Sequence, residues 1–204
     1  IDEEVISKLK TNENLKLKIT VNSATLKGRA LLMNETEENS IRILENIKRL
    51  SKAGISFCGS LVALPNITGW EDIRTTIEFL SNNNAENVKV LSPSYSRYSD
   101  QKIYPQELNF ISDLKDFIDS IQDEIECPVL LEPSHITDLK PEISSVLRQS
   151  PAWDAGIRRG DIILSVNGII PKCRVDAWNM LSASGKITAG VKSGDGIETI
   201  EWHN

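Results

Sequence analysis

The chain has 204 residues, of which 40% are hydrophobic and 25% are charged, and its formal net charge is −6. These are ordinary values for a globular protein, so they argue against a disordered chain and against a membrane span. The acidic excess lies before residue 135 and the remainder carries as many acidic as basic residues, so neither part offers a basic surface for nucleic acid.

The first elements alternate between strand and helix. Apolar and polar residues alternate over 17–21, which predicts a strand whose two faces meet different environments. An apolar stripe over 41–50 then predicts a helix that ends at Gly54. The short apolar run over 55–64, which stops at Pro65, predicts a buried strand.

The same alternation continues along the chain. Thr68 with Glu71 three residues later matches a capping box, which predicts that a helix begins at this point. The later predicted elements are a strand over 88–91, a loop over 92–104, a helix over 105–121 and a strand over 128–131.

Strands that alternate with helices at this spacing predict parallel pairing with helices outside the sheet. The fold class is therefore predicted to be α/β, with a partial (β/α) barrel of parallel strands over residues 1–127. In such barrels the chemistry lies beyond the carboxyl ends of the strands, which here are Asn22-Ser23, Pro65-Asn66 and Pro93-Ser94.

A family resemblance is carried by residues 17–24, 52–55 and 62–72, which look like the fourth and fifth strands of radical S-adenosylmethionine barrels. Residues 92–98 resemble the sixth strand and its loop. The resemblance implies a [4Fe-4S] cluster that is held by a CxxxCxxC loop and binds S-adenosylmethionine.

No cysteines in this chain have the CxxxCxxC spacing. The chain also begins with Ile1 rather than methionine, which predicts that it is cut from a longer protein. Two alternatives stay open: the cluster-binding half lies upstream of Ile1, or the fold has lost this chemistry. In the first case the full-length protein is an enzyme, and this fragment alone is inactive and holds no cofactor.

The resemblance implies that strand-end residues line the cofactor side of the barrel. These residues are Asn22, Ser23, Ser60, Pro65 and Pro93. Ser60 departs from the family, in which a larger polar residue is expected at this position. The alternative interpretation is that Asn22 and Ser23 only end a strand and that Pro65 only makes a turn.

The cysteines and histidines give no further candidate site. Cys58, Cys127 and Cys173 are far apart and odd in number, which suits reduced thiols in a cytoplasmic protein. Cys58 and Cys127 are interpreted as small buried side chains. His135 and His203 each stand without a nucleophile or ligand at a useful spacing.

The last third of the chain resembles a bacterial PDZ domain over residues 128–204, which would be small and rich in β-structure. Ser150 and Pro151 can cap and start a short helix, and Asn167-Gly168 is a favoured pair for a tight hairpin turn. The other predicted elements are strands over 162–166, 187–191 and 197–202 and a helix over 175–181.

PDZ domains bind a peptide or protein C-terminus by adding it to an exposed sheet edge. The resemblance places the carboxylate-binding loop at 139–142 and the edge strand at 143–147. Residues predicted to contact a peptide are Lys140, Ile143, Ser144, Ser145, Val146 and Val175. The loop departs from the family because Pro141 has no N–H and Glu142 repels a carboxylate, which Lys140 offsets in part. Scaffolding or intramolecular docking is therefore an equal alternative.

The sequence leaves two possible functions open. In the first, the chain is part of a radical S-adenosylmethionine-type iron–sulfur protein whose PDZ-like domain binds a partner. In the second, it is a non-catalytic adaptor that binds peptide C-termini. A CxxxCxxC motif in the gene upstream of Ile1 would favour the first function, and its absence would favour the second.

Overall fold

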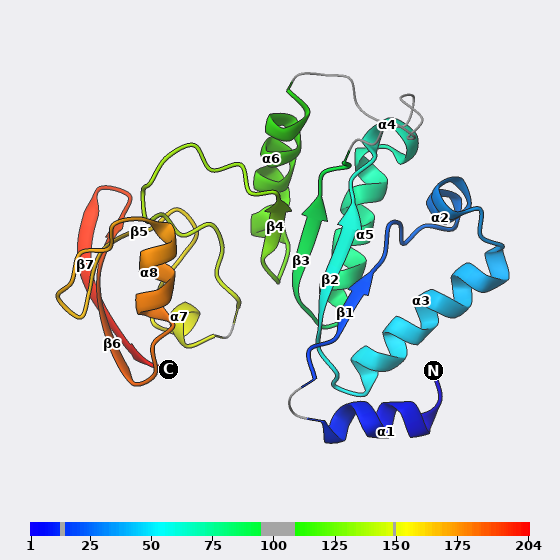
Figure 1. Ribbon diagram of the computed structural model, residues 1–204, viewed down its shortest axis with the longest axis horizontal. Helices are drawn as coiled ribbons and strands as arrows, with labels where there is room; N and C mark the ends of the chain where they lie inside the picture. Colours follow the sequence, from blue (N-terminus) through cyan, green and yellow to red (C-terminus); the bar gives the residue numbers. More distant parts are fainter. Residues whose placement is uncertain (13–14, 95–108, 149) are drawn as a thin grey trace. The chain divides into compact units, whose positions relative to one another are not determined.

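The first part of the chain is built on a four-stranded parallel sheet. The computed structural model describes residues 1–12, 15–94, 109–148 and 150–204, which form two compact units, Ile1–His135 and Ile136–Asn204. The sheet of the first unit has the order β1-β2-β3-β4 (Figure 1). Its strands are β1 (Lys18–Thr20), β2 (Phe57–Val62), β3 (Ala85–Leu91) and β4 (Val129–Glu132), all paired in parallel.

The helices of the first unit follow the strands in turn. They are α1 (Glu3–Thr11), α2 (Leu26–Met33), α3 (Glu37–Lys52), α4 (Pro65–Thr68), α5 (Trp70–Asn82), α6 (Phe110–Ile121) and the 3-10 turn η1 (Gln122–Glu124). Among the helices of the described residues, none combines the length and the apolar character that crossing a bilayer requires.

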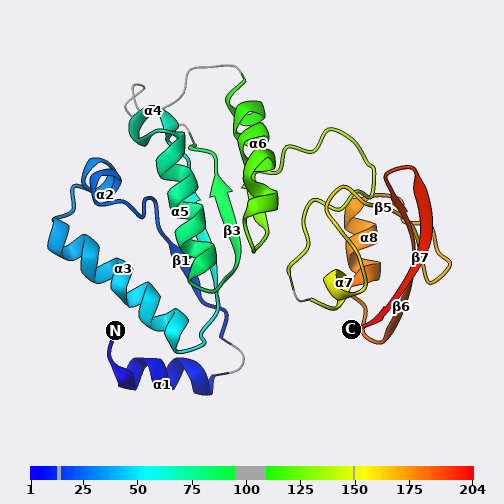
Figure 2. The same ribbon diagram turned by 180° about the vertical axis from the view of Figure 1, so that it is seen from behind.

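One face of the sheet packs against α3, α5 and α6. Apolar side chains from these helices, such as Ile47, Ile77 and Leu114, share a single core with Leu61 and Val88 of the strands. Helix α5 lies behind the sheet in Figure 1 and in front of it in Figure 2. Consecutive strand order with helices on one face is the winding of a barrel, and it differs from a doubly wound sheet, in which the strand order reverses. The predicted α/β partial barrel is confirmed.

Several element boundaries differ from the sequence predictions. Pro65 starts the extra turn α4, so Thr68 ends that turn and does not cap α5. The N-cap of α5 is Gly69, which has no side chain to act as a cap; its positive φ of 86° suits glycine and separates the two helices. The predicted capping box is therefore wrong. Most of the predicted loop over 92–104 lies outside the described residues.

The second unit is a small antiparallel sheet with two helices. Strands β5 (Ile162–Val166), β6 (Lys186–Ser193) and β7 (Gly196–His203) pair in that order, and the helices are α7 (Pro151–Asp154) and α8 (Arg174–Leu181). Ser150 caps α7 by accepting a hydrogen bond from the Trp153 N–H at 3.2 Å. Asn167 and Gly168 have φ of 49° and 80°, as the predicted tight turn requires. The β-rich PDZ-like part of the predicted fold is confirmed.

The segment that precedes α7 is not the strand expected over 143–147. Its pairing with β5 and the residues just before β5 consists of one bridge, between Glu142 and Ile162, and of backbone hydrogen bonds from Ile163 N to Pro141 O, from Ile143 N to Asp161 O and from Gly160 N to Ile143 O. Pro141 contributes no donor, and the chain then turns toward α7. The prediction of an edge strand is therefore wrong.

The division into two units falls later in the chain than the boundary predicted at 127–128. Strand β4 pairs in parallel with β3, for example Val90 with Leu131, so it is part of the first unit's sheet. The segment that follows β4 leads into the second unit at Ile136.

Candidate functional site

The sheet face turned away from the helix-packed core of the first unit is mostly polar. Side chains alternate between faces along a strand, so Phe57 and Leu61 enter the core while Ser60 points to the other side. Strand pairing aligns these outward residues in rows: Thr20, Ser60 and Lys89 form one row. We call this side of the sheet the polar face; its polar members are Lys18, Thr20, Asn22, Cys58, Ser60, Asn87, Lys89 and Glu132. The same rows also contain the apolar residues Val62, Leu91 and Leu130.

Hydrogen bonds join the side chains of the polar face across neighbouring strands. Thr20 Oγ1 and Ser60 Oγ lie 2.8 Å apart, and Lys89 Nζ donates to Glu132 Oε1 at 2.7 Å. The hydrogen bond to Glu132 raises the pKa of Lys89 above its ordinary value, against the opposing effect of desolvation. The face therefore presents hydroxyls, a charged ammonium and a carboxylate close to the carboxyl ends of the strands.

Asn22 and Ser23, which lie two and three residues after β1, are on opposite sides of the sheet. Asn22 lies on the polar face, where its Oδ1 accepts the Val62 N–H at 3.2 Å. Ser23 is fully buried, and its hydroxyl donates to Asp72 Oδ1 on α5 at 2.8 Å. The structure thus brings Asn22 and the buried Ser60 to one side of the sheet and places Ser23 on the other.

The two prolines predicted to line the site occupy loop positions. Pro65 is the first residue of α4 and is half-buried. Pro93 is half-buried two residues after the end of β3, and its carbonyl accepts a hydrogen bond from the Ser92 hydroxyl at 3.4 Å. Both lie beyond strand ends, and their role toward a cofactor stays a prediction.

Ser23 belongs to a buried polar network beneath α2. Asp72 Oδ1 accepts hydrogen bonds from Ser23 and from the Thr25 hydroxyl, the latter at 2.5 Å. A Cβ at Gly28 would lie 2.2 Å from Ser23 Oγ, so the absence of a side chain at Gly28 allows α2 to approach the network. This arrangement joins the segment after β1 to α5 and suits a structural role.

The sequence did not point to three residues of the polar face: Thr20, Lys89 and Glu132. The alternation of Asn87, Val88 and Lys89 was the available signal, because it placed polar and apolar residues on opposite faces of a strand. It did not reveal partners that lie 40 or more residues apart in the sequence.

The cysteines differ in their access to solvent. Cys127 is buried and Cys58 and Cys173 are half-buried, and all three are free thiols. Cys58 Sγ donates to Asn87 Oδ1 at 2.9 Å on the polar face, so the interpretation of a buried thiol holds for Cys127 but not for Cys58. Burial raises the pKa of the Cys127 thiol above its ordinary value.

We expect Cys127 to be alkylated at least about 10-fold more slowly than Cys58, because the reactive species is the thiolate and Cys127 is both buried and protonated. Time-resolved labelling of the folded chain with iodoacetamide at pH 8, followed by peptide mass spectrometry, measures both rates. Labelling in denaturant is the control and should remove the difference. Equal rates in the folded chain would contradict the described burial.

The residues predicted to bind a peptide are not all available for contact in the second unit. Ile143 and Val146 are half-buried and pack against its core, whereas Ser144 is exposed and Ser145 is half-buried. Lys140 is exposed. Val175 on α8 is 67% exposed, and Trp178, one turn further, is 71% exposed. The accessible part of the predicted site is therefore Lys140, Ser144 and the outer side of α8.

The cysteines of the described chain do not suit an iron–sulfur cluster. Within the described residues, no three His, Cys, Asp or Glu side chains are grouped so that they could hold a metal ion. Cys58 lies on β2, while Cys173 belongs to the second unit. The polar face is different, because its hydroxyl, amide, ammonium and carboxylate groups suit a zwitterionic organic ligand.

Comparison with known proteins gives a family-model match and similarity to solved structures. A family model described as PDZ domain matches residues 142–169, and curated protein sequences give no match. The structure of Streptococcus suis SuiB is similar with a TM-score of 0.54 and 17% identity, covering 66% of this chain and 31% of SuiB.

Two further SuiB structures are also similar. The form bound to S-adenosylmethionine gives a TM-score of 0.52 and 15% identity, over 66% of this chain and 31% of SuiB. The form bound to precursor peptide SuiA gives a TM-score of 0.50 and 16% identity, over 66% of this chain and 30% of SuiB. The chain thus spans about a third of SuiB. The chain therefore shares a fold with part of SuiB and contains a segment that matches the PDZ family model.

Proposed function

We propose that this chain is the C-terminal part of a radical S-adenosylmethionine-like iron–sulfur protein and that its PDZ-like part binds protein partners. The observation that carries the proposal is the polar face. A barrel-type parallel sheet presents linked polar side chains on the side opposite its helices, near the carboxyl ends of its strands.

The residues of the polar face would bind S-adenosylmethionine through its amino acid and ribose groups. Thr20, Ser60 and Asn22 offer hydroxyl and amide groups, and Lys89 and Glu132 offer one charge of each sign. Together with a cluster that donates one electron, S-adenosylmethionine bound by these residues would provide the chemistry for removing a hydrogen atom from a substrate. The cluster ligands are proposed to lie in a CxxxCxxC motif upstream of Ile1, which reading the encoding gene would reveal.

The experimental test is anaerobic iron–sulfur reconstitution of the full-length protein, followed by S-adenosylmethionine binding in equilibrium dialysis. We expect broad cluster absorbance and measurable binding. Lys89→Met should lower the affinity roughly 10-fold, because a hydrogen bond to a charged group is lost, while the cluster absorbance stays unchanged. Lys115→Met is the matched control, since Lys115 forms a comparable ion pair with Asp119 on α6.

The outcomes separate the parts of the proposal. Failure of the full-length protein to assemble a cluster would overturn the iron–sulfur function. A cluster-containing protein in which Lys89→Met and Lys115→Met bind S-adenosylmethionine equally well would overturn only the use of the polar face.

A second candidate function is a non-catalytic adaptor that binds peptide C-termini. The PDZ match over residues 142–169 favours it, as do the exposed apolar side chains of Leu139, Val175 and Trp178 in the second unit. PDZ domains hold the peptide carboxylate with converging donors. Absence of CxxxCxxC from the full-length protein, together with peptide binding by this chain, would favour the adaptor.

A further inference from the structure

Asp138 in the second unit has the surroundings of a bound carboxylate ligand. Arg174, the first residue of α8, donates from Nη1 to Asp138 Oδ1 at 2.8 Å and to its carbonyl oxygen at 3.2 Å. The Lys140 N–H donates to the same Oδ1 at 3.0 Å, and Lys140 Nζ lies 4.0 Å from Oδ2. A guanidinium, a backbone N–H and an ammonium thus converge on one carboxylate of the chain itself.

The donor set around Asp138 is not fully used. Arg174 Nε is buried and has no hydrogen-bond partner among the described residues, and the second nearby acid, Glu142, is 3.8 Å from Arg174 Nη2. An arginine binds a carboxylate best with two parallel N–H groups, and a buried donor without an acceptor is costly. The cluster therefore has at least one donor, Arg174 Nε, that its own acids do not occupy.

Apolar side chains flank the ion pair on both of its segments. Leu139, next to Asp138, is 74% exposed, and Val175, next to Arg174, is 67% exposed. Trp178 follows on the next turn of α8 and is 71% exposed. A cationic donor set between apolar side chains complements a peptide C-terminus, which has an α-carboxylate and, when its last residue is apolar, a hydrophobic side chain beside it.

We propose that Asp138 occupies a binding site for the C-terminal carboxylate of a partner peptide, and that the peptide binds by displacing Asp138 from Arg174 and from the Lys140 N–H. This inference rests on the proposed peptide-binding role of the PDZ-like part. Two cations, Lys140 and Arg174, are balanced by Asp138 and Glu142, so an incoming carboxylate competes with an internal one. The Arg174 hydrogen bond also lowers the pKa of Asp138 below its ordinary value, which keeps this competitor ionised.

The test compares the full chain with the Asp138→Asn variant, which removes the charge and preserves the size of the side chain. The probe is a pool of short N-acetylated peptides that end in Val, Leu, Ile or Phe, with either a free carboxylate or a C-terminal amide. We expect Asp138→Asn to bind the carboxylate pool about 5-fold more tightly than the unmodified chain. Shifts of the Lys140 amide and the Arg174 Nε–H should report this binding in NMR titrations.

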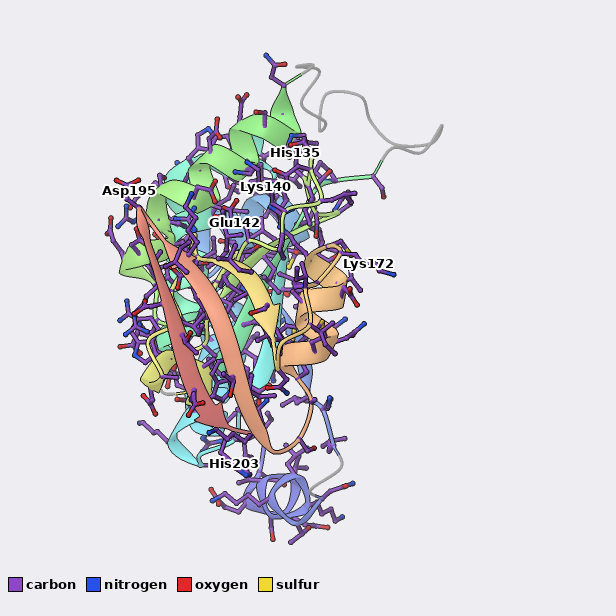
Figure 3. All side chains as sticks on the ribbon, turned by 90° about the vertical axis from the view of Figure 1, so that its left-hand side faces the viewer. His135, Lys140, Glu142, Lys172, Asp195 and His203 are labelled. Atoms are coloured by element: carbon purple, nitrogen blue, oxygen red, sulfur yellow. The ribbon has the colours of Figure 1, made fainter. Side chains whose placement is uncertain are left out.

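Two variants serve as controls. Asp195→Asn removes the same charge at the tip of the β6–β7 hairpin (Figure 3) and should leave the affinity unchanged. Arg174→Gln removes the main donor and should weaken binding at least about 10-fold in either background, because a charged bidentate partner is lost.

Each outcome has a separate meaning. Binding of the carboxylate pool to the unmodified chain with no gain from Asp138→Asn would overturn the displacement of Asp138 but keep peptide binding. Equal binding of the carboxylate and amide pools would overturn the carboxylate site. No binding to the unmodified chain, Asp138→Asn or Asp195→Asn would overturn peptide capture itself and the inference with it.

Discussion

Glu35→Ala is expected to lower the free energy of unfolding of the first unit by about 3 kcal/mol, because it leaves a buried charge without its partner. Arg29 is only 3% exposed, and its Nε and Nη2 donate to Glu35 Oε2 at 3.0 and 2.7 Å. The Ser40 hydroxyl also donates to this oxygen, at 3.3 Å. Amide hydrogen exchange of β2 and β3 peptides, followed by mass spectrometry, measures the loss.

Two further variants test whether burial of the ion pair causes the loss of stability in Glu35→Ala. Glu4→Ala breaks the exposed Glu4–Lys8 pair and should cost less than about 0.5 kcal/mol. Arg29→Met combined with Glu35→Leu should recover most of the lost stability, since an apolar pair replaces a buried ion pair at little cost. Similar losses for Glu35→Ala and Glu4→Ala would contradict the described burial of Arg29.

Leu61→Ala is expected to destabilise the first unit by about 2–5 kcal/mol, which is the range for a leucine truncated inside a packed core. Leu61 lies in the middle of β2, pairs with Val90 and is 0% exposed. Its side chain is on the face covered by α5, where Ile77 and Leu80 have no exposed surface. The free energy is again measured by hydrogen exchange in β2 and β3.

Leu31→Ala provides the comparison for Leu61→Ala. Leu31 lies on α2 and is 55% exposed, so its truncation removes little packing and keeps a good helix former. Its effect should stay within about 0.5 kcal/mol. If both leucine variants had the same stability, the placement of Leu61 in the core would be wrong.

Local residue patterns in the sequence were sufficient to predict several elements of the fold. The polar and apolar alternation at 17–21 predicted β1, and Gly54 ends α3 with φ of 73°. Ser150 and Asn167-Gly168 act as the cap and turn that their residue types favour. Each of these features depends on neighbours a few residues away, so the necessary information is present in a short window.

Features that depend on distant neighbours were predicted less well. Ile41 belongs to the predicted apolar stripe of α3 but is 46% exposed. The reason is that α3 buries only part of the face on which its apolar residues lie. The prediction for Thr68 failed because Pro65 begins a separate turn. Strand propensity alone did not show that the bridge with β5 is made by Glu142 and that the segment 143–147 is not a strand.

The sequence by itself determined the alternation of strand and helix, the fold class and the resemblance to two families, because hydrophobic periodicity and turn residues are local. Only the tertiary structure decided which polar groups meet. It pairs Lys89 with Glu132 and Arg174 with Asp138, and it separates Ser23 from Asn22. These relations depend on strand register and helix packing, which bring together residues that are far apart in the chain.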